Sequence, residues 1–273
     1  FSPAMTGYIF AALPPLVAAK IYGKKVILNY HSGELEAHLK RWKRLALPTM
    51  RKFDEVIVPS QFLVAVFAKF GLKSKAVFNF IDTEKFVFRT RNPLRPIFLS
   101  NRNFEMHYNV GGVLRAFQLI QKQIPEAALI VAGGGREEAE LEKTAADLRL
   151  ENVEFVGRVE QAEMPKIYDR ADIFLNASIV DNMPLSLLEA FACGLPVISS
   201  NAGGIPYLVK NGETGILVEK NDDKSLALQA LGLLENNERA QKIIRRALNE
   251  SQKYTAAKVL EEWRDIFSGE HKL

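Results

Sequence analysis

Residues 171–218 read ADIFLNASIVDNMPLSLLEAFACGLPVISSNAGGIPYLVKNGETGILV, and this stretch decides the fold. The apolar run 173–175 predicts a buried strand, and residues 184–193 predict a helix that ends at a glycine. Residues 197–199 predict the next strand, which a glycine pair follows. Strands and helices alternate along the rest of the chain as well, which predicts an α/β protein with parallel sheets and helices on both faces.

The start of the helix at residues 184–193 is a candidate site for phosphate. The first turn of a helix carries unpaired N–H groups and the positive end of the helix dipole, and both favour anions. The backbone around Asn182, Met183 and Leu185 would supply such groups, whereas Pro184 has no N–H. The alternative is an ordinary buried helix that an aspartate caps. The glycine pair after the next strand permits a close backbone approach and favours the ligand site.

Two carboxylates accompany this helix end. Glu189 lies four residues after Leu185 and hence on the same face, and helical side chains lean toward the N-terminus. Asp181 lies in the loop before the helix. A carboxylate beside a phosphate is electrostatically unfavourable unless it binds hydroxyl groups. The pair therefore indicates a ligand that has both a phosphate and a sugar.

The segment DNMPLSLLEAFACGLPVISSNAGGIPYLVKNGETGILV, residues 181–218, resembles the C-terminal signature of retaining glycosyltransferases of family 4, which have the GT-B fold. The family pattern is a glutamate, seven residues, a second glutamate, then Ala-x-Ala-x-Gly-x-Pro-Val and a Gly-Gly turn. Glu189 matches the second glutamate, and Asp181 stands where the first one normally stands. Similar features cover nearly all of the chain. The resemblance implies two Rossmann-like domains, each with a parallel sheet.

The resemblance implies three catalytic residues. Glu189 would bind the ribose hydroxyls of a nucleotide diphosphate sugar, and Asp181 would bind the hydroxyls of the transferred sugar. His31, which follows the predicted strand 26–30, would lie close to the anomeric carbon. All three follow a predicted strand or lie on the helix that comes next, and folds of this kind bind ligands at the carboxyl ends of their strands.

The remaining donor-binding residues also come from the resemblance. Arg102 matches an arginine that holds the diphosphate, whereas the family's second basic residue, a lysine, is missing, and Tyr108 or His107 occupies its place. Arg158 and Val159 form a turn whose backbone would lie against the nucleotide base. The resemblance implies that basic side chains and helix dipoles stabilise the leaving diphosphate, so neither a cofactor nor a metal is expected.

The composition is that of an ordinary globular protein with a mild positive charge. The net charge of +4 and the pI of about 9.0 favour an anionic ligand or membrane surface, and no motif indicates a nucleic-acid partner. The only cysteine is Cys193, which excludes an intrachain disulfide and favours a reducing, cytoplasmic compartment. The apolar run 8–19 is too short to span a bilayer and predicts a packed helix.

Residues 34–53 predict an amphipathic helix. Its apolar stripe includes Leu39, Trp42 and Met50, and Pro48 is expected to kink it. Two interpretations remain open: a helix that meets anionic lipid on the inner face of a membrane, or an ordinary solvated surface helix. The basic residues that surround the stripe are Lys40, Arg41, Lys43, Arg44, Arg51 and Lys52.

The sequence predicts three segments. We expect a partial N-terminal, acceptor-side domain over residues 1–91, a nucleotide-sugar-binding domain over 92–253, and a C-terminal helix over 254–273 that crosses back to the first domain. Residues 89–96 predict the linker. Family members begin with a strand and a glycine-rich loop that are absent here, so the first domain is expected to be truncated and the chain alone to transfer sugar poorly.

The interpretation that follows is an enzyme that moves a hexose from a nucleotide diphosphate sugar to a glycan or lipid-linked acceptor with retention at the anomeric carbon. Two alternatives stay open: a nucleotide-sugar-binding pseudoenzyme, which the missing lysine and Asp181 favour, and a sugar-nucleotide epimerase of the same fold. A dehydrogenase is disfavoured, because Glu138 stands where the dinucleotide fingerprint begun by Gly133 needs its third glycine.

Overall fold

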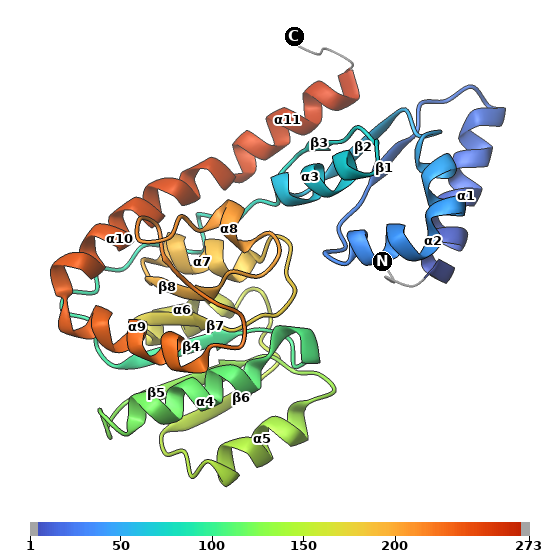
Figure 1. Ribbon diagram of the computed structural model, residues 1–273. Coiled ribbons are helices and arrows are strands. Elements are labelled where there is room, and N and C mark those ends of the chain that lie inside the picture. Colours follow the sequence, from blue (N-terminus) through green and yellow to red (C-terminus); the bar gives the residue numbers. More distant parts are fainter. Residues whose placement is uncertain (1–4, 269–273) are drawn as a thin grey trace. The chain divides into compact units, whose positions relative to one another are not determined.

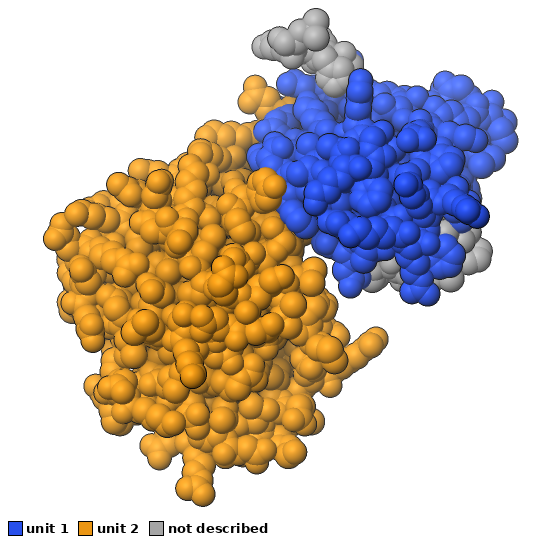
Figure 2. Space-filling model, in the orientation of Figure 1, with its two compact units in different colours: residues 1–79, 262–273 blue, residues 80–261 orange. Residues whose placement is uncertain are grey.

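The computed structural model describes residues 5–268 and divides the chain into two compact units (Figures 1 and 2). Unit 1 consists of residues 1–79 and 262–273, and unit 2 of residues 80–261. Each unit has its own parallel sheet, with three strands in unit 1 and six in unit 2. The predicted α/β class with parallel sheets is confirmed, and the six-stranded sheet forms a Rossmann-like domain.

The sheet of unit 2 has the strand order β6-β5-β4-β7-β8-β9, and every pairing is parallel. The first strand of the unit, β4, therefore lies at the centre. Strands β5 and β6 are added on one side of it and β7, β8 and β9 on the other, so the strand order reverses between β4 and β7. In doubly wound sheets this switch point, at the carboxyl ends of the strands, is where ligands bind. The strands are β4 (Ile97–Asn101), β5 (Ala128–Ala132), β6 (Val153–Gly157), β7 (Ile173–Asn176), β8 (Val197–Ser200) and β9 (Ile216–Val218).

Helices cover both faces of this sheet because successive strand side chains point to opposite faces. Phe98, Val131 and Ile173 belong to one apolar core together with side chains of α4, α5 and α9. Phe174, the residue after Ile173, stacks on Tyr168 of α6 instead, with ring centroids 6.1 Å apart. The helices of unit 2 are α4 (Val110–Gln121), α5 (Glu138–Asp147), α6 (Met164–Arg170), α7 (Leu185–Cys193), α8 (Ile205–Leu208), α9 (Asp223–Glu235) and α10 (Asn237–Ser251), with the short 3-10 helices η1 (Met106–Tyr108) and η2 (Gln252–Tyr254).

Unit 1 contains β1 (Ile27–Asn29), β2 (Glu55–Val58) and β3 (Lys75–Ala76), in that order, with α1 (Met5–Ile21), α2 (Leu35–Met50) and α3 (Gln61–Lys69). Ser60 begins α3 as expected from its type, because its hydroxyl oxygen accepts a hydrogen bond from the N–H of Leu63 at 3.2 Å. The last helix, α11 (Ala256–Ser268), has residues in both units. Within residues 5–268, no helix is both long and apolar enough for a membrane crossing.

The helix α2 differs from its prediction at one point. Its backbone is non-helical at Trp42, with φ −116° and ψ 24°, whereas the kink was expected at Pro48. Leu39 and Met50 are buried as predicted, but the break turns Trp42 out of the stripe and leaves it 37% exposed. Trp42 therefore belongs to the solvent-facing side of α2, together with Arg41, whose guanidinium lies 5.5 Å from the indole centroid.

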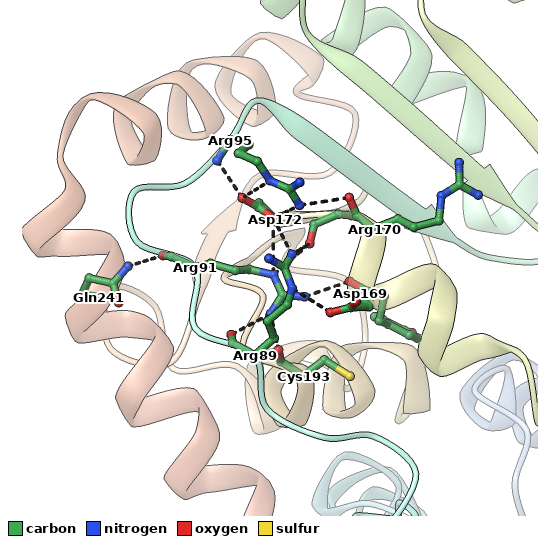
Figure 3. Close-up of polar contacts among 10 residues, drawn as sticks. Arg89, Arg91, Arg95, Asp169, Arg170, Asp172, Cys193 and Gln241 are labelled. Carbon is green, nitrogen blue, oxygen red and sulfur yellow. Dashed lines mark hydrogen bonds and ion pairs between the residues drawn. The ribbon is translucent and has the colours of Figure 1, made fainter.

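Residues 89–96, which the sequence predicts as a linker, lie inside unit 2 and are fastened to it by arginine side chains (Figure 3). The buried Arg91 donates to the carbonyl oxygens of Tyr168, Ala171 and Cys193, and so joins the end of α6 to the end of α7. Arg89 and Arg95 pair with Asp172. Unit 2 begins at Phe80, so residues 89–96 belong to it, and these contacts hold them against the sheet.

Candidate functional site

The carboxyl edge of the six-stranded sheet collects most of the predicted donor-binding residues. Arg102 directly follows β4, Arg158 follows β6, and the loop with Asp181 follows β7 and leads into α7. Because β4 and β7 are neighbours, Arg102 and Asp181 meet at the switch point of the sheet. The structure thus brings together residues that are about 80 positions apart in the sequence.

Arg102 is the centre of this cluster. One terminal nitrogen forms an ion pair with the carboxylate of Asp181, and the other donates to Ser186 Oγ at 3.1 Å. The guanidinium also lies over the ring of Tyr108, with its central carbon 4.1 Å from the ring centroid. Burial raises the pKa of Tyr108, which therefore stays neutral. Arg102 Nε is buried and has no hydrogen-bond partner within the described residues.

Asp181 does not cap the helix that follows it. The residue before α7 is Pro184, which makes no side-chain cap, and Asp181 Oδ1 instead accepts from the backbone N–H of Asn182 at 2.9 Å. Asn182, Met183 and Pro184 are buried, whereas Leu185 at the start of α7 is 37% exposed. The capping interpretation of this loop is therefore wrong, since the Asp181 carboxylate faces its neighbour and Arg102.

The glycine pair Gly203-Gly204 holds the Asp181 loop in place. A Cβ atom at Gly203 would lie 2.1 Å from the carbonyl oxygen of Asp181, and one at Gly204 would lie 1.9 Å from that of Asn182. The N–H of Gly204 donates to the Asp181 carbonyl at 3.0 Å, and Gly203 has a positive φ of 52°. The chain's own loop thus requires both glycines, whereas the sequence pattern had favoured a ligand as the group that approaches them.

Glu189 lies in α7 and is only 5% exposed. Its two carboxylate oxygens accept from Tyr168 Oη at 2.8 Å and from Gln161 Nε2 at 3.1 Å. Burial raises the pKa of Glu189, and the hydrogen bonds from Tyr168 and Gln161 counteract this only in part. Tyr168 and Gln161 were missed from the sequence. The available signal was a tyrosine within an otherwise apolar helix face, because a buried tyrosine hydroxyl usually has a partner.

Of the other predicted residues, Arg158 and Val159 follow β6 and His31 lies in unit 1. Arg158 is exposed and passes over Gly134, where a Cβ atom would lie 2.7 Å from Arg158 Cγ, and Val159 is half-buried beside it. His31 belongs to unit 1, where its Nε2 lies 2.9 Å from Asn29 Oδ1. That His31 joins the residues of unit 2 around one ligand therefore stays a prediction.

A metal site and a reactive thiol each have requirements that can be compared with the described residues. In the part of the chain from residue 5 to 268, no three His, Cys, Asp or Glu side chains are grouped so as to hold a metal ion. Burial raises the pKa of Cys193 to about 12, so its thiol is protonated at neutral pH. What the site offers is an arginine, two carboxylates with different partners, and the start of a helix.

Comparison with known proteins identifies the family to which this chain belongs. Residues 82–250, well over half of the chain, match the family described as glycosyl transferases group 1. The N-acetyl-alpha-D-glucosaminyl L-malate synthase of Bacillus anthracis is 29% identical over 71% of this chain, and the sulfoquinovosyl transferase SQD2 of Arabidopsis thaliana is 27% identical over 88%. The chain spans about half the length of these curated relatives, 53% and 51% respectively.

Solved structures agree on the fold. The Anabaena protein HepE, solved in complex with UDP-glucose, superposes with a TM-score of 0.82 over 93% of this chain and 75% of its own, at 19% identity. The C-terminal domain of a group 1 glycosyl transferase from Francisella tularensis superposes with a TM-score of 0.58 and covers 64% of this chain. The predicted GT-B fold is confirmed, and the chain belongs to the glycosyl transferases group 1.

Proposed function

We propose that this chain carries the donor half of a retaining hexosyltransferase of family 4, which moves a hexose from a nucleotide diphosphate sugar to a glycan or lipid-linked acceptor. The observation that carries the proposal is the cluster of Arg102, Asp181 and Glu189 at the switch point of a doubly wound sheet. A relative from Mycolicibacterium smegmatis, 27% identical over 84% of this chain, is a GDP-mannose-dependent mannosyltransferase. Donors of this chemical class are therefore the first to test.

In this proposal Arg102 exchanges partners when the donor binds. Its guanidinium is paired with Asp181 and has one buried N–H to spare, so a diphosphate at the start of α7 would receive a charge-assisted hydrogen bond from it. Positive charge held beside the leaving diphosphate stabilises the transition state without a metal. Tyr108, stacked on Arg102, keeps the guanidinium in place where the family has a lysine.

The two carboxylates take different parts of the donor. Glu189, one turn inside α7, would accept hydrogen bonds from the ribose hydroxyls, which are strongest when its carboxylate is ionised. Asp181, once Arg102 turns to the diphosphate, would accept from hydroxyls of the hexose. Arg158 and Val159 would lie against the base, and His31 of unit 1 would approach the anomeric carbon from the acceptor side.

Calorimetry with a nucleoside diphosphate and its sugar tests this division. Glu189→Ala is expected to weaken both ligands by about one to two orders of magnitude, because a hydroxyl–carboxylate bond contributes about 1.5–3 kcal/mol. Asp181→Ala is expected to weaken the nucleotide sugar alone. A thermal-shift screen over UDP, GDP and ADP sugars selects the ligand first. Equal loss of the bare nucleoside diphosphate in both variants would overturn the assigned roles.

One observation favours a second candidate, a protein that binds nucleotide sugar without transferring it. The family's lysine is absent, and the remaining cation, Arg102, already has an acidic partner in Asp181. The full-length protein with donor and acceptor separates the candidates, because only a transferase releases free nucleoside diphosphate in step with glycosylated acceptor. An epimerase of the same fold would change the donor without any acceptor.

The exposed side of α2 supports a peripheral contact with the inner face of an anionic membrane in the cytoplasm. Trp42 and Leu45 are 37% and 42% exposed and lie among Lys40, Lys43 and Arg44. Each basic residue near such a surface contributes about 1 kcal/mol. Sedimentation with phosphatidylserine vesicles is expected to weaken with salt and in Lys43→Glu/Arg44→Glu. Binding that ignores both changes would leave α2 as ordinary surface.

A further inference from the structure

The hydroxyl group of Tyr168 has three hydrogen-bond contacts in the interior of unit 2. It lies 2.8 Å from Glu189 Oε2 and 3.0 Å from the carbonyl oxygen of Ser186, and it accepts from Asn101 Nδ2 at 3.2 Å. Asn101 ends β4, whereas Ser186 and Glu189 belong to α7. One side chain of α6 thus joins the end of the central strand to the helix that begins at the candidate donor site.

The ring of Tyr168 is fixed on several sides. It is fully buried, stacks on Phe174 and meets Phe86 edge-on at 5.6 Å between ring centroids. Its backbone carbonyl accepts from Arg91 Nη2 at 2.9 Å. Arg91, labelled in Figure 3, also binds the carbonyl of Cys193 at the end of α7. Contacts of both the backbone and the ring of Tyr168 therefore fix the position of its hydroxyl relative to α7.

The hydroxyl has a choice of acceptors. A phenol has one hydrogen to donate, and Asn101 already donates to its oxygen. Of the two acceptors in reach, the Glu189 carboxylate gives the stronger, charge-assisted bond when it is ionised. With that bond and the one from Gln161, each carboxylate oxygen of the buried Glu189 has a donor.

We propose that Tyr168 is the positioning residue of Glu189: its hydroxyl holds the carboxylate in the orientation in which it accepts hydrogen bonds from the ribose of the donor. This inference rests on the proposed function, because it takes the ribose as the ligand of Glu189. Gln161 is the weaker second support, since it is exposed to solvent.

The same hydrogen bond affects the charge of Glu189. The groups that face this carboxylate are Tyr168 of α6, Arg102 after β4, Gln161 before α6, and Cys193 of α7. Burial raises the pKa of Glu189, and the Tyr168 hydroxyl is the first of the groups that lower it. Without that hydroxyl the pKa of Glu189 would rise further, and its ability to bind ribose would be lost at a higher pH.

The experiment compares a ribonucleotide with its 2′,3′-dideoxy counterpart, using whichever of UDP, GDP and ADP the wild type binds most tightly. The ratio of the two dissociation constants isolates the ribose hydroxyls and cancels the titration of the phosphates. We expect the wild type to prefer the ribonucleotide about tenfold or more. Tyr168→Phe keeps the ring and is expected to cut this ratio at least threefold and to move its acid limb to higher pH.

Controls separate the two hypotheses. Tyr254→Phe removes a hydroxyl from another buried tyrosine of unit 2 and should keep the wild-type ratio. Glu189→Gln should abolish most of the preference for ribose. If Glu189→Gln keeps the preference, Glu189 does not bind ribose and the proposed role of Glu189 fails. If Glu189→Gln loses it while Tyr168→Phe keeps both the ratio and its pH profile, the positioning role is overturned and the proposed function stands.

A second variant is needed if thermal unfolding shows that Tyr168→Phe does not fold. Site-specific 3-fluorotyrosine at position 168 keeps the shape and makes the phenol a stronger donor. It is expected to move the acid limb of the ribose preference to lower pH, opposite to the phenylalanine variant. An acid limb that stays in place with the fluorinated side chain would overturn the proposal.

Discussion

Strand β7 has an aspartate–arginine cluster at each end, and the two clusters differ in how fully they are satisfied. Asp172, before the strand, is 1% exposed and is surrounded by Arg89, Arg91 and Arg95. Asp181, after the strand, pairs with Arg102 alone, and Arg102 retains a buried N–H without a partner in the described chain. In the first cluster Arg89 Nε also lacks a hydrogen bond, but it lies 2.7 Å from the Asp169 carboxylate. Among the described residues no second acid pairs with Arg102, so its Nε leaves hydrogen-bonding capacity for a ligand.

The difference between these two clusters shows how a charged cluster that stabilises the fold can be distinguished from one that binds a ligand. Burial by itself raises the pKa of Asp172, but hydrogen bonds from Arg95 and Arg89 outweigh it, so the net shift is downward. Every arginine there also binds carbonyl oxygens, among them those of Ala171 and Arg170. An arginine bound to carbonyls at several element ends fastens a fold, whereas one stacked on a tyrosine can turn to an incoming anion.

The largest effect should follow from breaking the Asp172 cluster at Arg91. Arg91→Met keeps the length of the side chain but leaves the carbonyls of Tyr168, Ala171 and Cys193 without this donor. We expect unit 2 to lose about 3–5 kcal/mol in urea unfolding, the usual loss when one member of a buried charged network is removed. Arg170→Met serves as the control, because Arg170 pairs with Glu154 at the exposed surface and should change stability by less than about 1 kcal/mol. Equal effects of both variants would contradict the distinction.

The next effect concerns Asp172 and depends on pH. Its pKa in the folded chain lies below the ordinary value of 3.8, so the stabilisation that it gives is present above about pH 4 and is lost as the pH falls through the folded-state pKa. Asp172→Asn is expected to cost about 2–3 kcal/mol at neutral pH. The gap between wild type and variant should narrow below about pH 4, as measured by urea unfolding across pH. A gap that stays constant down to low pH would show that the charge of Asp172 is not the source of its effect.

The smallest stability effect is expected at the Asp181 cluster. Asp181→Asn loses one ion pair and should cost about 1 kcal/mol, less than Asp172→Asn, because Arg102 keeps Ser186 and the ring of Tyr108. The same variant frees Arg102, so affinity for a bare nucleoside diphosphate should stay equal or increase in calorimetry. A stability loss as large as that of Asp172→Asn, with weaker nucleotide binding, would make Asp181 a structural residue of the same kind.

Much of this arrangement could be predicted from local sequence. Short apolar runs predict buried strands such as β2 and β7, and a serine at position 60 is typical of the start of a helix such as α3. The spacing of Asp181 and Glu189 around one helix start also predicted that both would lie near the same edge of the sheet. These features depend on residues close together in the chain, and that is why a pattern can reveal them.

The missed features depend on partners far apart in the sequence. Residues 89–96 look like a linker because they are polar and contain Asn92-Pro93, and nothing local shows that Arg91 ends up 2% exposed. Tyr168 and Glu189 are 21 positions apart, and their contact requires α6 and α7 to pack on the same face of the sheet. The reason for glycine at positions 203 and 204 could not be predicted either, since the backbone that excludes a Cβ atom there belongs to a loop about 20 residues earlier.

The contacts of Arg91 bear on the order in which parts of the chain can fold during synthesis. Its carbonyl partners come 77, 80 and 102 residues later, so the arginine leaves the ribosome long before Cys193 exists. Until then its charge must stay in water, because an unpaired guanidinium is too costly to bury. We therefore expect the segment before β4 to dock fully only after α7 has formed, because contacts of such long range close late in folding. Any shortened version of unit 2 that begins after Arg91 loses this last step altogether.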